Sequence, residues 1–122
     1  MAALEQNERE VLETLIEYSP KLIHGMQVVC TELLEDKAED TYEYLKTVVE
    51  GMNWEIEVFN GFKELFAEME LSFDKDSMNE AVLRFNDAYK AKDDVAIAKC
   101  LMDDTIDVFI LIEDLSKQAL AK

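Results

Sequence analysis

Proline and glycine are scarce in this chain. Its 122 residues include one proline, Pro20, and three glycines, Gly25, Gly51 and Gly61. Both residue types interrupt helices and dominate tight turns, so their scarcity argues against a fold made of many short elements. All three glycines fall within helical patterns, where each costs up to about 1 kcal/mol relative to alanine. They indicate either a close approach, between helices or to a ligand, or local tolerance of a small bend.

Cysteine and histidine are equally rare. Cys30 and Cys100 are far apart in the sequence and form no Cys-x-x-Cys motif, and His24 is the single histidine. A ferritin-like di-metal site needs Glu-x-x-His on two helices. Lys21 stands three residues before His24, so that site is excluded. We expect free cysteines in a reducing compartment, and no cofactor.

Basic residues are few, and long apolar runs are missing. The chain has 12 Lys and Arg against 28 Asp and Glu, a net charge of -16, whereas nucleic acids and anionic membranes require a basic footprint. The longest apolar run, Val108–Ile112, is far shorter than the roughly 20 residues of a membrane span. The first five residues lack the basic and apolar regions of a signal peptide. We therefore expect a cytoplasmic protein with a protein partner, and neither nucleic acid nor membrane.

Motifs for catalysis are also lacking. No nucleophile elbow and no phosphate-cradling glycine loop is present. Paired acids are common, but acid–base catalysis needs a carboxyl group that is desolvated in a cleft, and no pair stands out. We predict that the protein is not an enzyme. An enzyme with a carboxylate-rich site is the alternative from another class.

What the chain does have is apolar residues at helical spacing, which make up much of its 49% hydrophobic content. The first pattern predicts a helix over about 4–36, kinked at Pro20, because the apolar phase passes through the proline unchanged. Ser19 as N-cap with Pro20 as first residue would instead begin a second helix. The inward positions of this pattern are Leu4, Val11, Leu15, Tyr18, Leu22, Met26, Val29 and Leu33.

Three further helices follow in the sequence. The spacing predicts a long helix over about 39–71 and a short one over about 77–91, which begins with a Ser77–Glu80 capping box. Asp93 or Asp94 caps a last helix that runs to about 120, with Val95 among its inward residues. The predicted fold is all-α: residues 1–122 form one domain, an antiparallel up-and-down bundle of about four helices.

The long middle helix carries an acidic stripe. Eleven acids and three bases fall within residues 38–76, and four of these acids recur every seven residues: Glu43, Glu50, Glu57 and Glu64. Such a stripe is either a solvated face or a docking surface for a basic segment.

The same helix carries a second apolar stripe beside its main one, formed by Trp54, Val58, Phe62 and Leu65. The last helix is apolar all round at Val108–Ile112, which is typical of a helix at the centre of a bundle or at an interface. We expect the second apolar stripe and the last helix to mediate self-association or to bind a partner.

Several segments resemble a known family. Tyr18–Met26, Val49–Trp54, and Phe85–Asp93 followed by Ile97–Leu101 are similar to an uncharacterised family of small acidic helical proteins from Gram-positive bacteria. That resemblance implies a helical fold and no chemistry.

A second resemblance involves Pro20–Ile23, which is similar to a Pro-x-x-Leu-Ile segment of the flagellar export chaperones. His24–Met26 stands where those proteins have Leu-Tyr-Asp-Gly. The resemblance implies a protein that binds a helix of a secreted or flagellar partner. The function predicted from the sequence is a non-enzymatic helical interaction module, with an export-chaperone-like role as the alternative.

Overall fold

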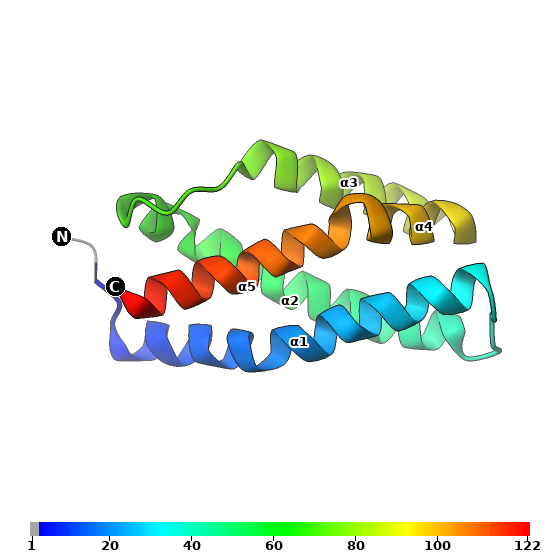
Figure 1. Ribbon diagram of the computed structural model, residues 1–122, viewed down its shortest axis with the longest axis horizontal. Coiled ribbons are helices and arrows are strands. Elements are labelled where there is room, and N and C mark those ends of the chain that lie inside the picture. The colour runs from blue at the N-terminus through cyan, green and yellow to red at the C-terminus, as the bar shows by residue number, and fades with distance from the viewer. Residues whose placement is uncertain (1–2) are drawn as a thin grey trace.

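A computed structural model describes residues 3–122, and every regular element in that part of the chain is a helix (Figure 1). The all-α prediction is therefore confirmed. The elements are α1 (Gln6–Leu34), α2 (Thr41–Glu68), α3 (Lys75–Ala91), α4 (Asp94–Cys100), the π-helical turn η1 (Leu101–Thr105) and α5 (Ile106–Ala121). In Figure 1, α1 runs away from the end where the chain begins, α2 returns beside it, α3 runs out again, and α4 and α5 lead back.

Helix α1 is continuous through Pro20, so the interpretation as two helices is wrong. Proline has no N–H to donate to the carbonyl of Ile16, yet packing on both sides of it holds the helix together. A kink at Pro20 stays a prediction. Most of the buried positions alternate in steps of three and four, and Gly25 and Cys30 are buried beside them: Leu12, Leu15, Ser19, Leu22, Met26, Val29 and Leu33. Val11, predicted to face inward, is instead exposed, because Leu12 and Leu15 carry the inward face there.

The start of α3 corrects a second prediction. Asp74 is the N-cap, and its carboxylate accepts hydrogen bonds from the backbone N–H groups of Asp76 and Ser77, each at 3.1 Å. Ser77 therefore lies inside the helix and cannot cap it. At α4 the prediction is confirmed, since the carboxylate of Asp93 accepts from the N–H of Ala96 at 3.1 Å.

The last helix is interrupted by η1, a π-helical turn that sequence periodicity did not predict. On either side of it, the buried residues of α4 and α5 face the same core. Val95, predicted to face inward, is 58% exposed, because Ile97 and Ala98 carry the inward face of α4.

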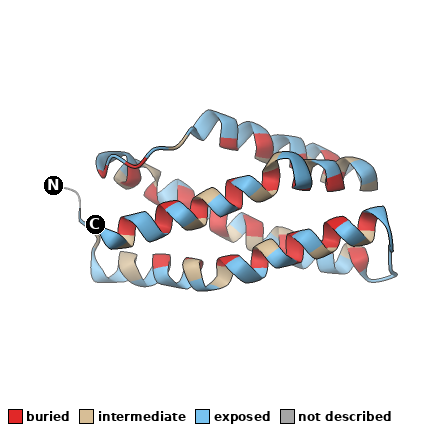
Figure 2. Cartoon of the chain, viewed as in Figure 1, coloured by how far each residue is buried: buried red, intermediate tan, exposed pale blue. Residues whose placement is uncertain are grey.

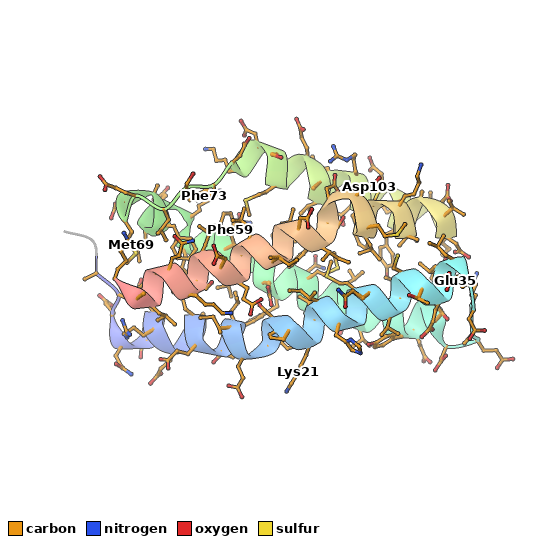
Figure 3. The ribbon with its side chains drawn as sticks, viewed as in Figure 1. Lys21, Glu35, Phe59, Met69, Phe73 and Asp103 are labelled. Atoms are coloured by element: carbon orange, nitrogen blue, oxygen red, sulfur yellow. The ribbon has the colours of Figure 1, made fainter. Side chains whose placement is uncertain are left out.

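The core lies between α1, α2 and α5, where α5 packs against both of the long helices. Figure 2 shows buried positions along the inner sides of these helices and exposed positions along their outer sides. Helix α3 approaches α4 and η1 most closely. The segment between α2 and α3 folds back on the core through Phe73, whose ring meets that of Phe59 edge-on at a centroid distance of 5.3 Å (Figure 3).

Candidate functional site

The acidic stripe lies on the outer side of α2. All four of its residues, Glu43, Glu50, Glu57 and Glu64, are exposed. Within residues 3–122 three ion pairs form, Lys37–Asp94, Arg84–Asp104 and Lys117–Glu113, and none of them involves the stripe. At 1.5 Å per residue the stripe extends over about 32 Å. It is therefore a long anionic surface without a bound cationic side chain.

The second apolar stripe is more covered than its composition suggests. Phe62 is buried and stacks on Phe66 at a centroid distance of 5.9 Å. Trp54, Val58 and Leu65 are half-buried and pack against the core. Much of this surface thus stabilises the single chain, and only its edge is left for a partner.

The apolar segment of the last helix is mostly internal. Val108, Phe109 and Ile112 are buried in α5, whereas Ile110 is 47% exposed. A helix that contacts both α1 and α2 needs apolar residues on most of its circumference.

A shallow groove of about 450 Å³ lies between α1 and α2 at the edge of the second apolar stripe. The rings of Tyr18 and Trp54 meet edge-on across it at a centroid distance of 6.0 Å. Glu50 of the acidic stripe also lines it, so the groove and the stripe are continuous. The lining residues of this α1–α2 groove are Thr14, Tyr18, Thr47, Glu50, Gly51 and Trp54.

Gly51 is the floor of the α1–α2 groove. A Cβ atom at this position would collide with the hydroxyl of Tyr18 and would lie 3.2 Å from Cδ1 of Leu22. Gly25 has a similar role on α1, where a Cβ would lie 3.1 Å from the Tyr44 hydroxyl and 3.2 Å from Cγ2 of Val48. Both glycines therefore allow the two long helices to approach closely.

Gly61 differs from the other two glycines, because a Cβ there would meet nothing within 4 Å. Of the two explanations that the sequence allowed for the glycines, a close approach between helices applies to Gly25 and Gly51. Local tolerance applies to Gly61.

The functional candidate that sequence reasoning missed is a buried acid. Glu55 of α2 and Ser19 of α1 are both 0% exposed, and the Ser19 hydroxyl donates a hydrogen bond of 2.8 Å to Oε2 of Glu55. The second oxygen, Oε1, has no hydrogen-bond partner. A buried carboxylate oxygen without a partner is costly, so the neutral acid is favoured.

Burial raises the pKa of Glu55 to about 7, the main cause being desolvation of its carboxyl group. The hydrogen bond from Ser19 lowers the pKa, and the charge of Glu113 raises it. Glu113 is itself half-buried and paired with Lys117 at 3.2 Å. The pKa of Tyr18 is also raised, by its burial and by the charge of Glu55.

The spacing of the buried positions along each helix could have predicted that Ser19 and Glu55 face inward. Along α2 the buried residues follow steps of three and four, and Glu55 occupies one of these inward positions, just as Ser19 does on α1. A pattern of apolar residues alone favours the neighbouring positions Val49 and Ile56 instead, and both are half-buried. The inward series of α2 is Leu45, Val48, Met52, Glu55, Phe59, Phe62 and Phe66.

The remaining candidate groups offer little chemistry. Cys30 is a buried free thiol whose S–H donates to the carbonyl of Ala98 at 3.6 Å, and burial raises the pKa of both Cys30 and Cys100. His24 is exposed on α1. Among the described residues, no three His, Cys, Asp or Glu side chains gather as metal ligands. In the same part of the chain, no helix combines the length and the apolar character needed to cross a membrane.

This is an all-helical, acidic protein. Its most accessible candidate site is the surface that the acidic stripe and the α1–α2 groove form together. The chain belongs to the family described as domain of unknown function DUF8042, whose model matches residues 10–115. No curated protein and no solved structure matched the chain. Membership agrees with the resemblance to an uncharacterised family.

Proposed function

We propose that this protein is a non-enzymatic interaction module. Its helices form an antiparallel, up-and-down bundle that binds a basic amphipathic segment of another protein on the face shared by α1 and α2. One observation carries the proposal: the apolar α1–α2 groove and the acidic stripe adjoin and share Glu50.

The geometry of a helix explains why these two features form one surface. At about 100° per residue, the four acids of the stripe lie within about 40° of Glu50 around the axis of α2. Trp54 and Val58 lie about 40° and 80° from Glu50, on the side where Trp54 meets Tyr18 of α1. A bound helix could therefore place an apolar anchor in the groove and cationic side chains on the stripe.

The charge of the surface supports a basic occupant. The chain carries -16, and the acids of the stripe have no ion-pair partner among residues 3–122. Such a field attracts cationic partners and repels anionic ones. The stripe's length of about 32 Å matches a helix of about 21 residues.

The test uses Trp54, the single tryptophan of the chain, as a probe inside the groove. A synthetic amphipathic helix with lysine every seven residues and one central leucine is titrated into the protein. We expect the Trp54 emission to change saturably, with an affinity that falls as salt screens the charges. The variant Glu50→Lys with Glu57→Lys should weaken binding at least tenfold.

A matched control carries the same change of net charge on α3. Glu80 and Asp87 are exposed and seven residues apart, like Glu50 and Glu57. The variant Glu80→Lys with Asp87→Lys should bind the peptide nearly as well as the unmodified protein. Equal loss in both variants would mean that net charge, and not the α1–α2 surface, attracts the peptide, and the proposal would be wrong.

Self-association is the alternative form of an interaction function. Trp54, Val58 and Leu65 keep partial exposure, and Ile110 adds an exposed apolar side chain on α5. Two copies repel each other at -16 each, so added salt should strengthen a dimer, whereas it should weaken the complex with a basic peptide. Sedimentation at low and high salt therefore distinguishes the two occupants.

An export-chaperone-like role is a special case of the same proposal, in which the basic amphipathic segment belongs to a secreted or flagellar protein. It places the protein in the cytoplasm, where its free cysteines stay reduced. The rival class, an enzyme, would need a second acid beside Glu55 in an open cleft. The half-buried Glu113 is paired with Lys117 instead.

A further inference from the structure

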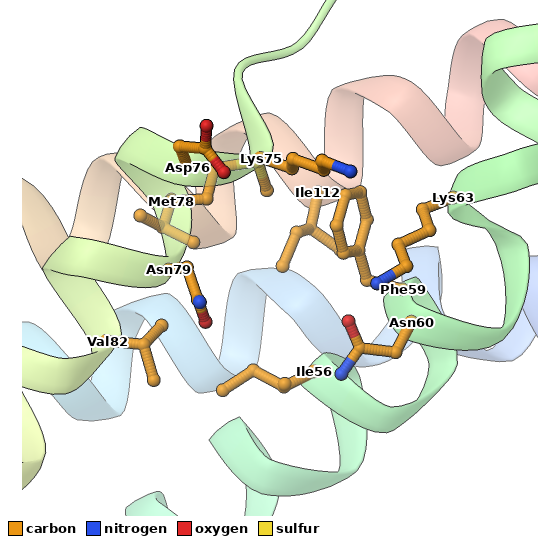
Figure 4. Close-up of a pocket in the computed structure, with 11 residues that line it drawn as sticks. Ile56, Phe59, Asn60, Lys63, Lys75, Asp76, Met78, Asn79, Val82 and Ile112 are labelled. Atoms are coloured by element: carbon orange, nitrogen blue, oxygen red, sulfur yellow. The ribbon is translucent and has the colours of Figure 1, made fainter.

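A pocket of about 310 Å³ lies on the opposite side of α2 from the acidic stripe, between α2, α3 and α5. Figure 4 shows its apolar side chains, among them Phe59, Ile56, Val82 and Ile112, converging from the three helices. Helix α3 approaches α4 and η1 most closely, and the pocket lies along its first turns, where Lys75, Met78 and Val82 line it together with residues of α2 and α5. Phe73 packs on Phe59 nearby, so the connection between α2 and α3 is fixed to the core.

The rim of this pocket has an unusual charge for such an acidic protein. Lys63 of α2 and Lys75 of α3 both line it, with Asp76 as the single acid among the lining residues. Neither lysine takes part in an ion pair within residues 3–122. In the view of Figure 4 the ammonium groups of Lys63 and Lys75 lie on the side of the pocket where Phe59 stands, and the carboxylate of Asp76 points away from them. The local net charge is positive in a molecule that carries -16.

The rim also supplies neutral hydrogen-bonding groups. The amides of Asn60 and Asn79 lie on opposite sides of the opening (Figure 4). Each side-chain amide offers both a donor and an acceptor. The lining is therefore mixed, about half apolar and half polar or charged, which suits a ligand with both kinds of surface.

We propose that this pocket binds a small amphipathic carboxylate, a molecule with one anionic head and an apolar body of about eight carbons. The head lies between Lys63 and Lys75, and the body lies against Phe59, Val82 and Ile112. The size follows from the volume: at roughly 30 Å³ per water-sized group, the pocket holds about ten non-hydrogen atoms. The charge of the head follows from the two unpaired lysines, since a cationic or neutral head would leave both without a partner.

Octanoate is a suitable probe, because it has ten non-hydrogen atoms and one carboxylate. Methyl NMR spectra would be recorded during a titration well below the micelle concentration. We expect saturable shifts at Ile56, Val82, Val108 and Ile112, with Leu12 and Leu33 as unaffected reporters on α1. A dissociation constant of the order of 0.1–1 mM fits a ligand of this size.

Two matched ligands and two variants test the assignment. Octanol and octylammonium have the same number of carbons with a neutral or cationic head, and each should bind at least tenfold more weakly than octanoate. Lys63→Gln with Lys75→Gln should reduce octanoate affinity about tenfold, whereas Lys46→Gln with Lys90→Gln, at exposed positions outside the pocket, should leave it unchanged. Val82→Trp should fill the pocket and abolish binding.

The proposal is overturned if octanoate causes no saturable shifts in the folded protein. Binding of octanol or octylammonium as tight as that of octanoate would also overturn it, because the lysines would then select nothing. Circular dichroism of each variant verifies folding. The lysines of this pocket are not part of the α1–α2 groove, so failure here leaves the binding of a basic segment untouched.

Discussion

The hydroxyl of Ser19 donates a 2.8 Å hydrogen bond to Oε2 of Glu55, and both side chains are completely shielded from solvent. This contact joins the middle of α1 to the middle of α2, one residue before Pro20. Because Oε1 of Glu55 has no partner, this pair leaves one polar atom unsatisfied inside a mostly apolar core. The stability of the protein should therefore depend on the protonation of one carboxyl group.

The first prediction concerns pH. The pKa of Glu55 is raised from 4.5 to about 7 in the folded state, so the folded chain favours the protonated acid. The stabilisation is fully present below pH 4.5 and is lost as pH rises through about 7, a change of about 3 kcal/mol. Glu55→Gln, which resembles the protonated acid, should remove this dependence and unfold at higher urea than the unmodified protein at pH 8. The comparison of the two proteins at pH 5 and pH 8 cancels the titration of the other acids.

Ser19→Ala should reveal the strength of the hydrogen bond. Loss of the donor leaves both carboxyl oxygens without a partner, which should raise the pKa of Glu55 further and destabilise the protein by about 1–3 kcal/mol at pH 8. The same substitution in the Glu55→Gln background should cost less, because a neutral amide accepts a weaker hydrogen bond. A double-mutant cycle by urea unfolding measures the difference. Identical costs in both backgrounds would show that the carboxylate gains nothing from Ser19.

The two glycines Gly51 and Gly61 should respond oppositely to alanine. At Gly61 the new methyl meets no atom within 4 Å, so the higher helix propensity of alanine should stabilise the protein by up to about 1 kcal/mol. At Gly51 the methyl would collide with the Tyr18 hydroxyl, which should displace the ring from Trp54 and cost about 1–3 kcal/mol. Thermal unfolding and Trp54 emission report the two effects. Adding Tyr18→Phe to Gly51→Ala should recover part of the loss.

The cap of α3 provides a fourth prediction. Asp74→Ala removes the acceptor for two backbone N–H groups and should destabilise the protein by about 0.5–2 kcal/mol. Ser77→Ala is the matched control, since Ser77 is exposed within the helix and its side chain has no role as N-cap. Urea unfolding of the two variants compares them directly. A larger cost at Ser77 than at Asp74 would restore the capping box that the sequence predicted.

Much of the helical architecture could be read from periodicity. Helix formation depends on a local repeat of about 3.6 residues, and the apolar residues of α1 keep that repeat across Pro20. The same local logic explains the errors at the helix ends. Asp74 and Ser77 are both good N-caps in isolation. Which of them begins the helix depends on the position of the preceding residue, Phe73, which is held on the core by its contact with Phe59.

The acidic stripe and the second apolar stripe show which parts of the candidate site can be predicted from the sequence. Seven-residue spacing places Glu43, Glu50, Glu57 and Glu64 on one side of a helix whatever lies beside it. It does not determine how far Trp54 and Phe62 are covered, since that depends on α1 and α5. The distinction between a core residue and a docking residue is therefore tertiary.

What the sequence by itself determined is the set of helices and the side of each that is apolar, because both follow from interactions within a few residues. The pairing of Ser19 with Glu55, the fit of Tyr18 over Gly51 and the placing of Lys63 and Lys75 around one pocket were decided only by the tertiary structure. Each of these arrangements joins two helices at a particular register, and a shift of one helix by a single turn, about 5.4 Å, would separate the partners while leaving every helical pattern unchanged.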